Sequence, residues 1–351
     1  MILEKITLAR FRNHESFELK PDAKTTVIIG PNARGKTNIL EAIYLMALSK
    51  SFRTNKQSDL ILWDQDYCRV TGEFTKDRGE TISLEVFFGN PPNPKRALKV
   101  NGVKVSPANF IGNCQIVFFH PEDLNILYLG PDLRRKYLDV LNLQVNKAYY
   151  KALSAYRRVL KHRNALLKGI KEGASKRSDL EVWDEQLAIH GKVLLGQRIQ
   201  SVNFLNEWIS AIYNEIGGKN DTVALDYQST IKGDYMENLS EVLERDIQAG
   251  FTTRGPHRDD LHIYLNERLL SEHASRGEYR SLLLGLKLLE MRFYENQSGE
   301  KPILLLDDVF SELDNDRQDH LMKAIKGYQA ILTTTHFEAH IKGQICELNT
   351  E

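Results

Sequence analysis

One short motif constrains this sequence more than any other feature. Residues 30–37 read GPNARGKT and satisfy the pattern G-x-x-x-x-G-K-[ST]. The β-branched run at 25–29 predicts a strand directly before the motif, and residues 38–48 predict a helix directly after it. A glycine-rich loop between a strand and a helix can wrap its backbone N–H groups around a phosphate chain. The sequence therefore predicts a nucleotide-binding unit built from strands and helices.

The residue types in the motif assign the contacts that the loop would make. Lys36 is expected to reach the β and γ oxygens of ATP, and Thr37 to offer its hydroxyl oxygen to Mg²⁺. The glycines let the backbone curve closely around the phosphates. ATP and Mg²⁺ are the predicted cofactors, and the predicted ATP-binding residues of the loop are Gly30, Pro31, Asn32, Ala33, Arg34, Gly35, Lys36, Thr37 and Asn38.

The second half of such a site is an apolar strand that ends in an acidic residue. Residues 303–306 are Ile-Leu-Leu-Leu and are followed by Asp307 and Asp308. We assign Asp307 to the Mg²⁺ shell and Asp308 to the position of a base for the attacking water. Buried strands also end in a capping acid for structural reasons, so this strand alone is weak evidence. Asp307 lies 271 residues after Lys36, which indicates that a large segment is inserted between the two halves.

Two further segments suit phosphate contacts. Ser275 and Gly277 precede a predicted helix at 281–293, where free N–H groups could dock a phosphate, although an ordinary helix cap would have the same sequence. His336 closes the strand-like run TTTH, and its side chain could touch a γ-phosphate, although a histidine at a strand end is more often structural. Both segments occur together with the first two motifs and in this order along the chain, which favours the functional interpretation.

The chain alternates between strand-rich and helical parts. The apolar spacing at 146–170 and the stretch at 180–216 predict two long helices that can pair antiparallel. The segments on either side are rich in short apolar strands. We therefore expect a discontinuous α/β or α+β head formed by 1–120 and 249–351, with an inserted helical lobe at 121–248.

The basic residues are unevenly distributed. The chain has 47 basic and 47 acidic residues, so its formal charge is zero. Residues 134–177 hold thirteen Lys or Arg and two acids, a net of +11, while the rest of the chain holds 34 and 45, a net of −11. Such an excess can present a positive surface to DNA phosphates. The candidate DNA-binding residues lie away from the apolar stripe of the first long helix, on a face that could equally be only solvated: Lys147, Lys151, Arg158, Lys161 and Lys168.

The cysteines and apolar runs favour a cytoplasmic location. Cys68, Cys114 and Cys346 are far apart and lack CxxC spacing, so neither a disulfide framework nor a zinc site is indicated. Residues 1–10 read as a strand and not as a signal peptide. No apolar run approaches the roughly 18 residues that a membrane helix needs, so no membrane partner is expected.

Taken together, these motifs resemble the RecF family of bacterial recombination mediators, within the ABC and SMC-type ATPase heads. The resemblance covers nearly the whole chain. Its most specific stretches are PEDL and GPDLRRKYLD within 121–139 and LLLDDVFSELDNDR at 304–317, whereas the phosphate loop alone would not distinguish the family. Further matching segments are Phe11–Asn13, Ser51–Arg53, Thr253–Asp260, Ser275–Glu278 and His336.

The resemblance implies an α/β fold, namely an ABC-type P-loop ATPase head with mixed sheets plus the inserted helical lobe. ATP held by the loop of one copy would meet Ser275 and Gly277 of a second copy, so that the homodimer depends on ATP. Arg12 would lie near the nucleotide, and residues 311–314 at the dimer seam. His336 would act as the switch histidine.

The resemblance also implies the partners and the process. Members of the family bind DNA, which here could be single-stranded, double-stranded or gapped. They work with RecR and RecO to help load RecA at gaps, and they support replication restart and the SOS response. We expect hydrolysis to be slow and switch-like, because Asp308 is one methylene shorter than glutamate and a misplacement of about 1 Å can cost roughly a hundredfold in rate.

Three rival functions share parts of the pattern. A transporter ATPase would carry the signature Leu-Ser-Gly-Gly-Gln, whereas this chain reads Ser-Arg-Gly-Glu at 275–278. A long SMC or Rad50-type tether needs more than the insertion of about 130 residues, which could extend at most about 90 Å as two paired helices. An attached nuclease would need a metal-binding acidic cluster beyond Asp307 and Asp308. Two features stay open: residues 253–260 could simply be a turn, and Gln115 is a candidate for a glutamine loop at the nucleotide.

Overall fold

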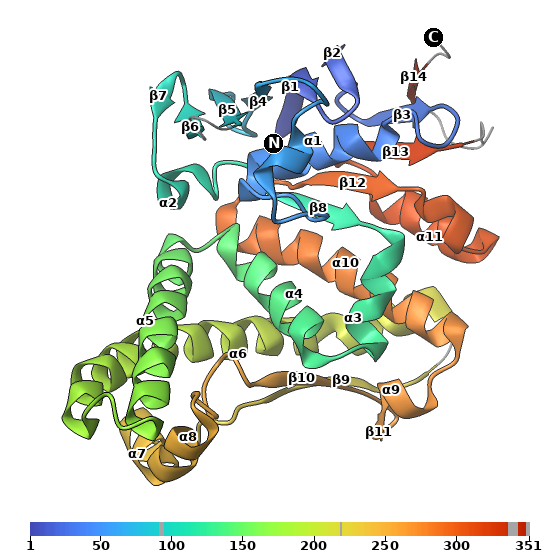
Figure 1. Cartoon of the computed structure of the whole chain (residues 1–351). Helices are drawn as coiled ribbons and strands as arrows, with labels where there is room; N and C mark the ends of the chain where they lie inside the picture. The colour runs from blue at the N-terminus through green and yellow to red at the C-terminus, as the bar shows by residue number, and fades with distance from the viewer. Residues whose placement is uncertain (91–94, 218–219, 336–342, 349–351) are drawn as a thin grey trace. The chain divides into compact units, whose positions relative to one another are not determined.

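The computed structural model describes residues 1–90, 95–217, 220–335 and 343–348 (Figure 1). The chain has an α/β fold in two units. The first unit comprises Met1–Leu124, Glu215–Gly218 and Arg276–Glu351, and the second comprises Asn125–Asn214 and Lys219–Ser275. Among the described residues, no helix combines the length and the apolar composition that crossing a bilayer requires.

A five-stranded parallel sheet forms the centre of the first unit. Its strand order is β14-β3-β13-β12-β8, and every described pair is parallel. The carboxyl ends of parallel strands meet at one edge, so residues that follow β3, β8, β12 and β13 converge there. The strands are β3 (Thr25–Ile29), β8 (Ile116–Phe119), β12 (Ile303–Asp307), β13 (Ala330–Thr334) and β14 (Gln344–Glu347).

A six-stranded antiparallel sheet forms the second layer of the first unit, in the order β2-β1-β4-β5-β6-β7. Alternate residues of β4 and β5 are buried, which is the pattern of a sheet with one covered face and one solvated face. The presence of both sheets confirms the predicted mixed-sheet head. Its strands are β1 (Ile2–Phe11), β2 (His14–Leu19), β4 (Tyr67–Thr75), β5 (Thr81–Gly89), β6 (Lys95–Val100) and β7 (Val103–Lys104).

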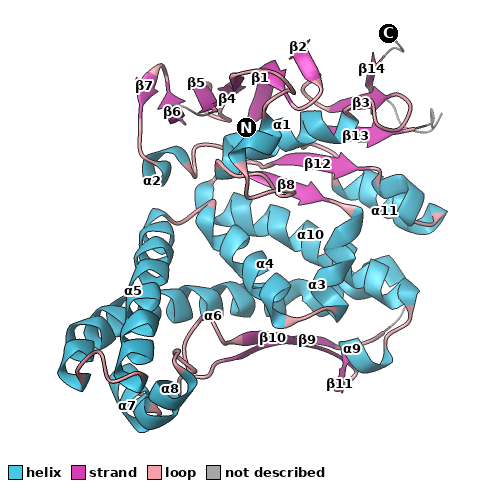
Figure 2. Ribbon diagram, viewed as in Figure 1, coloured by secondary structure: helices cyan, strands magenta, loops and turns pink. Residues whose placement is uncertain are grey.

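Helix α1 (Lys36–Leu48) lies between these two sheets and contacts β4, β5, β12 and β13 (Figure 2). Nearly every residue of α1 is buried, which fits a helix that is apolar all around. Helix α10 (Arg276–Ser298) packs on β8. The unit is completed by the α-helices α2 (Pro107–Phe110) and α11 (Asn315–Ala324) and the 3₁₀ helices η1 (Gln57–Leu60), η2 (Pro121–Leu124) and η4 (Val309–Glu312).

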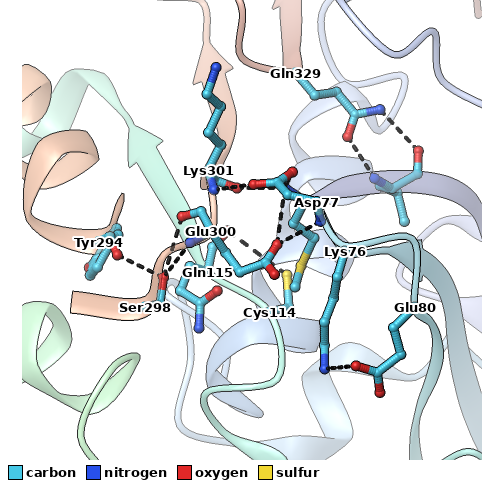
Figure 3. A network of polar contacts seen from close by, with 12 residues as sticks. Lys76, Asp77, Glu80, Cys114, Gln115, Tyr294, Ser298, Glu300, Lys301 and Gln329 are labelled. Atoms are coloured by element: carbon cyan, nitrogen blue, oxygen red, sulfur yellow. Dashed lines mark hydrogen bonds and ion pairs between the residues drawn. The ribbon is translucent and has the colours of Figure 1, made fainter. Parts of the chain in front are cut away.

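Polar contacts join the two sheets of the first unit at the amino ends of the parallel strands (Figure 3). The amide of Gln329, directly before β13, bonds both backbone groups of Leu3 in β1: its Oε1 accepts from the N–H at 2.7 Å and its Nε2 donates to the carbonyl at 3.0 Å. Beside this pair, the N–H of Lys301 donates to Asp77 Oδ2 at 2.9 Å. The two buried bonds of Gln329 satisfy backbone groups of Leu3 where no strand continues the ladder.

The second unit is mainly helical and contains the two long helices that the sequence predicts. They are α5 (Lys147–Lys171) and α6 (Glu181–Gly217), and Asn146 bonds Gln197 while Arg163 bonds Asp184, so the pairing runs antiparallel as predicted. The other elements are α3 (Asn125–Tyr128), α4 (Pro131–Leu143), η3 (Arg177–Leu180), β9 (Val223–Gln228), α7 (Tyr235–Glu241), α8 (Leu243–Ala249), β10 (Asp260–Leu265), β11 (Arg268–Leu269) and α9 (Leu270–His273).

Apart from the short stretch Glu215–Gly218, the chain returns to the first unit at Arg276, later than the predicted return at 249. The reason is a small sheet that the sequence did not reveal. Strand β9 follows α6 inside the inserted segment, and β10 pairs with it antiparallel from Asp260 to Leu265. Residues after 249 therefore belong with the lobe, because a strand stays with its hydrogen-bonding partner.

A polar core stabilises the second unit, and we define it as Asp139, Arg163, Asp184, Arg198 and Asp246. The side chain of Arg163 interrupts the apolar stripe of α5 and is fully buried. Its Nε donates to Asp184 Oδ1 at 2.5 Å, and its Nη1 donates to Asp246 Oδ2 at 2.6 Å. The interruption is thus a buried ion pair that links α5, α6 and α8.

The segment 253–260 packs against this polar core and is more than a turn. Arg198 donates to Asp139 Oδ1 at 2.8 Å and to the carbonyl of Pro256 at 2.7 Å. Gly255 has φ 129°, and a Cβ there would lie 2.5 Å from the hydroxyl oxygen of Tyr156, so only glycine fits. The segment therefore has a structural explanation within the second unit.

Candidate nucleotide-binding site

The loop between β3 and α1 has the backbone that its glycine demands. Gly35 has φ 90°, and a Cβ at this position would lie 2.4 Å from Asn13 Oδ1 and 2.5 Å from His14 Nε2. Any larger residue would clash with both side chains. The left-handed conformation of Gly35 turns the chain directly into α1, so the N-terminus of that helix opens at the loop.

Lys36 is buried, and its ammonium group is held by the loop itself. The Nζ donates to the carbonyl of Gly30 at 2.5 Å and to that of Pro31 at 2.9 Å. Burial lowers the pKa of Lys36, while the carboxylates of Asp308 and Asp307 oppose that shift. Backbone carbonyls carry no full negative charge, so an anion placed beside Nζ would stabilise the charged form further.

Asp307 lies between two threonine hydroxyls at the carboxyl end of β12. Its Oδ1 accepts from Thr37 Oγ1 at 3.0 Å and from Thr333 Oγ1 at 2.7 Å. The structure thus brings together the hydroxyl and the carboxylate that the sequence assigned to Mg²⁺ from positions 270 residues apart. Both are oxygen donors of the hard type that Mg²⁺ prefers, so the donor set fits that ion.

Asp308 lies directly beside this pair but has a different environment. Its φ is 51°, and its N–H donates to Thr333, to the carbonyl oxygen at 3.2 Å and to Oγ1 at 3.1 Å. The backbone is therefore held in a left-handed conformation that is uncommon outside glycine. The carboxylate lines a cavity and makes no hydrogen bond or ion pair with the described residues. A carboxylate in this position is available to a ligand or a water molecule.

Arg12 lines the same cavity and is fixed from behind. Its guanidinium donates to Glu41 through Nε at 2.8 Å and Nη2 at 2.6 Å, and Nη1 donates to the carbonyl of Asp59 at 2.7 Å. Glu41, in α1, is completely buried and also accepts from Ser51 Oγ. The sequence pointed to Arg12 but not to Glu41, which nothing in its local pattern distinguishes from a surface glutamate.

Further side-chain hydrogen bonds continue around the loop. Arg53 Nη1 donates to Asn38 Oδ1 at 2.9 Å, and Asn38 Nδ2 donates to Asn13 Oδ1 at 2.7 Å. These contacts give a physical role to the segments Phe11–Asn13 and Ser51–Arg53, which approach the loop from the antiparallel sheet and from the chain after α1.

His120 is a site residue that sequence reasoning missed. It follows β8 at the carboxyl edge of the parallel sheet, and its Nε2 lies 3.7 Å from Asp307 Oδ2. Gln115 instead lies before β8, at the opposite end of the strand, where its buried side chain donates to the carbonyl of Gly112 at 3.0 Å. Gln115 does not line the cavity, so the interpretation of Gln115 as a glutamine-loop residue is wrong.

The cavity enclosed by these groups has a volume of about 890 Å³. All of its lining residues belong to the first unit. Gly30 and Pro31 contribute carbonyls to Lys36 instead of lining the cavity, and Arg34 does not line it. The predicted residues that do line it are Arg12, Asn32, Ala33, Gly35, Lys36, Thr37, Asn38, Asp307 and Asp308.

The predicted signature residues lie at the start of α10. Ser275 directly precedes the helix, and the carbonyl of Gly277 accepts from Arg317 Nη2 at 3.1 Å. Arg317 Nε also donates to Ser281 Oγ at 3.0 Å. Because the N–H of Arg317 also donates to Asp314 Oδ1 at 3.1 Å, this end of α10 is tied to residues 311–314, which by the family resemblance are expected at a dimer seam. His336 lies outside the described residues.

The five candidate DNA-binding residues are all exposed on α5. Their spacing of four, seven, three and seven residues puts them on one face of the helix. Lys168 lies 3.9 Å from Glu172, and the other four make no ion pair with the described residues. Several other cations of the basic segment are neutralised internally, for example Arg134 by Asp260 and Arg177 by Glu244.

Comparison with known proteins identifies the family. The chain matches the family described as RecF/RecN/SMC N terminal domain over residues 2–344. A Bacillus mycoides protein named DNA replication and repair protein RecF is 38% identical over 352 residues, covering 96% of this chain and 93% of that protein. Two solved structures of the recombination mediator protein RecF in the RecFOR pathway, one with ATPrS and one with ATP, superpose with TM-scores of 0.92 and 0.91 at 34% and 33% identity. They cover 98% and 99% of this chain, and 95% of each of those chains is covered. This chain therefore belongs to the RecF family.

Proposed function

We propose that the chain is an ATP-dependent DNA-binding protein of recombinational repair, acting in the cytoplasm. The observation that carries the proposal is the cavity of the first unit, where Lys36, Thr37, Asp307 and Asp308 converge. Its volume lies within the range of ligand sites. The relatives described with bound ATP support ATP as the ligand.

ATP would be held by the loop and by the N-terminus of α1. Lys36 lies where it would contact the β and γ phosphates, and Arg12, fixed by Glu41, would contact the nucleotide from the other wall. Mg²⁺, when bound by Thr37 and Asp307, would neutralise charge on the phosphate oxygens. The head would thus bind the nucleotide, and the inserted lobe would carry the DNA-binding helix.

The bound nucleotide would also join two copies of the chain. Ser275 and Gly277 of one copy, with the N–H groups that begin α10, would dock the γ-phosphate held by the other copy. The contact of Arg317 with Gly277 supports this, because Arg317 also bonds Asp314 and so ties the start of α10 to residues 311–314 at the proposed seam. ATP would therefore favour the dimer, and its loss would favour separate monomers.

Hydrolysis would be slow and would reset the dimer. Asp308 is the proposed base, since its carboxylate is unpaired at the cavity wall, and His336 is the proposed switch histidine. We expect a turnover below about 10 per second without partners, which is the median for enzymes in general. A faster rate for the isolated protein would contradict a switch.

DNA would be clamped through contacts between cationic side chains of α5 and the DNA backbone. The four unpaired cations Lys147, Lys151, Arg158 and Lys161, with Lys168, share one exposed face without a built pocket for a base. RecO and RecR are the proposed protein partners, because the related structures are described as part of the RecFOR pathway. Together they would support RecA loading at gaps, replication restart and SOS induction.

The solution mass of the protein tests the ATP-dependent dimer. Wild type should have the mass of a dimer with ATP and of a monomer with ADP, as measured by light scattering. Ser275→Arg should bind ATP in calorimetry but remain a monomer, whereas Lys36→Ala should lose ATP binding itself. Ser178→Arg, in the exposed η3, adds the same side chain elsewhere and should dimerise normally. A dimer of Ser275→Arg with ATP would reject the sandwich.

The salt dependence of DNA binding tests the α5 surface. Each phosphate contact on duplex DNA should contribute about −0.9 to the slope of log K against log salt. Combined charge reversal of Lys151, Arg158 and Lys161 should flatten that slope by up to roughly 3. The control reverses three exposed lysines of the first unit, and unchanged affinity of the α5 variant would exclude this surface; the control residues are Lys24, Lys104 and Lys326.

A further inference from the structure

Trp63 has an unusual position at the wall of the nucleotide cavity. Its side chain is 89% exposed, although indole is among the largest apolar surfaces that a protein can bury. It nevertheless lines the cavity that also contains Lys36 and Asp307. An exposed tryptophan at a ligand cavity can bury its apolar surface when a ligand binds.

The turn that carries Trp63 is fixed on both sides. The N–H of Leu62 donates to the carbonyl of Arg10 at 2.9 Å, and the N–H of Gln65 closes the turn onto the carbonyl of Leu62 at 3.1 Å. Asn90, at the end of β5, donates from Nδ2 to the carbonyl of Gln65 at 3.0 Å. The backbone therefore presents the indole at a defined place, which lowers the entropy lost when a ligand covers it.

The turn that carries Trp63 and the phosphate loop are anchored to one short segment of the chain. The N–H of Leu62 donates to the carbonyl of Arg10, and Asn13 lies against Gly35 of the phosphate loop. Phe11 pairs with His14, and Arg10 and Arg12 have positive φ of 54° and 56°, so a tight hairpin turn joins Arg10 to Asn13. Trp63 and the phosphate loop are thus held by the same short segment, and both line one cavity.

The lining of the cavity combines two kinds of chemistry. The phosphate loop and the end of β12 offer Lys36 and two carboxylates, which suit phosphates and a metal ion, whereas the turn after η1 offers Ile61, Leu62 and Trp63. Within the described residues that line the cavity, Trp63 is the only Phe, Tyr or Trp. A nucleobase is the part of a nucleotide whose flat face matches an indole.

We propose that Trp63 stacks on the base of the bound nucleoside triphosphate and is a specificity-determining residue of the site. This inference rests on the proposed ATP site and adds how the base is bound. Stacking recognises the aromatic face and not the hydrogen-bonding edge. Trp63 therefore favours purines over pyrimidines, whose ring is smaller, and contributes similarly to adenine and guanine nucleotides.

Calorimetry of Trp63→Ala with two ligands tests the stack. The dissociation constant for ATP should rise about 5- to 150-fold, the range that corresponds to stacking of one base, and Trp63→Phe should recover most of the loss. Inorganic tripolyphosphate has no base, so its dissociation constant should not change in either variant. That ligand is the matched control, because a general disturbance of the cavity would weaken both.

Fluorescence gives an independent reading of contact. The chain has three tryptophans, so Trp183→Phe combined with Trp208→Phe leaves Trp63 as the single indole. ATP should quench its emission, and tripolyphosphate should not. Equal ATP affinity of wild type and Trp63→Ala, or an equal loss of tripolyphosphate binding, overturns the inference alone. Binding of neither ligand by wild type overturns the proposed ATP site and the inference with it.

Discussion

The nucleotide cavity of the first unit and the polar core of the second unit both gather charged side chains away from bulk water, but they differ in how those charges are paired. In the polar core, Arg163 is enclosed by two carboxylates and Arg198 by another carboxylate and a carbonyl. In the cavity, Lys36 is bonded only to backbone carbonyls, and the carboxylate of Asp308 has no partner among the described residues.

Internal pairing decides which buried charges are available for binding. A buried ion that is fully paired inside the protein has no capacity left for a ligand, and removing one partner leaves the other uncompensated. A charge at a cavity wall with weak internal partners can gain most of its interaction from a ligand instead. Removal of charges should therefore destabilise the polar core strongly and the cavity only weakly.

The largest effect on stability is expected for Arg163→Ala. The substitution leaves the buried Asp246 and the half-buried Asp184 without their shared cation. We expect a loss of about 3–5 kcal/mol in the free energy of unfolding, the usual cost of breaking a buried ion pair. Urea denaturation of the variant and of wild type at the same pH measures it.

Arg158→Ala on the same helix is the matched control for this loss. Arg158 is exposed and makes no ion pair with the described residues, so its removal should change stability by no more than about 0.5 kcal/mol. Similar losses for the two variants would show that the pairing of Arg163 is not what stabilises the second unit.

A smaller effect with a defined pH dependence is expected for Glu290, in α10. Burial raises its pKa to about 7 from an ordinary value of 4.5, although Lys287 lies 3.1 Å away. The folded chain therefore holds this proton up to about pH 7, whereas the unfolded chain releases it near 4.5. Stability from this group is complete below pH 4.5, falls as the pH rises to 7, and stays constant above it.

Glu290→Gln removes this titration and leaves the others in place. Between pH 5 and 8, wild type should lose more unfolding free energy than the variant, by up to about 3 kcal/mol for a shift of this size. His257, whose pKa burial lowers to about 4, titrates in both proteins and cancels in the difference. Parallel curves of stability against pH would show that Glu290 is ionised throughout.

The sequence predicted the local elements of the site because their signals are local. The strand at 25–29 and the helix that follows it are confirmed, as are the long helix α5 and the strand before Asp307. In each case the signal is an apolar period or a glycine motif, and it comes from residues within a few positions of one another. The fold class followed from the motif resemblance and is also confirmed.

Long-range contacts were beyond such reasoning. Glu41 gains its role from Arg12 and Ser51, and His120 gains its place from the pairing of β8 with β12. The basic segment 134–177 appeared strongly positive because acids that neutralise it, such as Asp246 and Asp260, lie outside it in the sequence. Local patterns carry no information on these tertiary pairings.

Glu41→Gln tests the part of the cavity that most resembles the polar core. Glu41 is completely buried and accepts two of the three hydrogen bonds that the Arg12 guanidinium donates. Hydrogen bonds to charged groups contribute about 1.5–3 kcal/mol, so we expect a loss of about 2 kcal/mol in denaturation. ATP affinity should also fall, because Arg12 is then less well fixed.

Glu85→Gln is the control for Glu41→Gln. Glu85 pairs with Lys99 at 2.8 Å on the antiparallel sheet, but the Lys99 side chain is 36% exposed, so the loss should be at most about 1 kcal/mol. Comparable losses at both positions would indicate that burial of Glu41 adds nothing to the strength of its pairing with Arg12.

The smallest effect on stability is expected for Asp308→Asn, although its effect on hydrolysis should be large. The substitution keeps the shape of the side chain and the backbone bonds to Thr333, and asparagine tolerates the left-handed φ of 51°. Because the carboxylate has no internal partner among the described residues, the unfolding free energy should change by no more than about 0.5 kcal/mol. ATP turnover should fall by at least the hundredfold that general base catalysis commonly contributes. Denaturation and single-turnover hydrolysis of the same preparation measure both quantities. A loss of several kcal/mol would mean that Asp308 is a structural charge like those around Arg163, and the distinction between the two regions would fail at the residue on which it depends most.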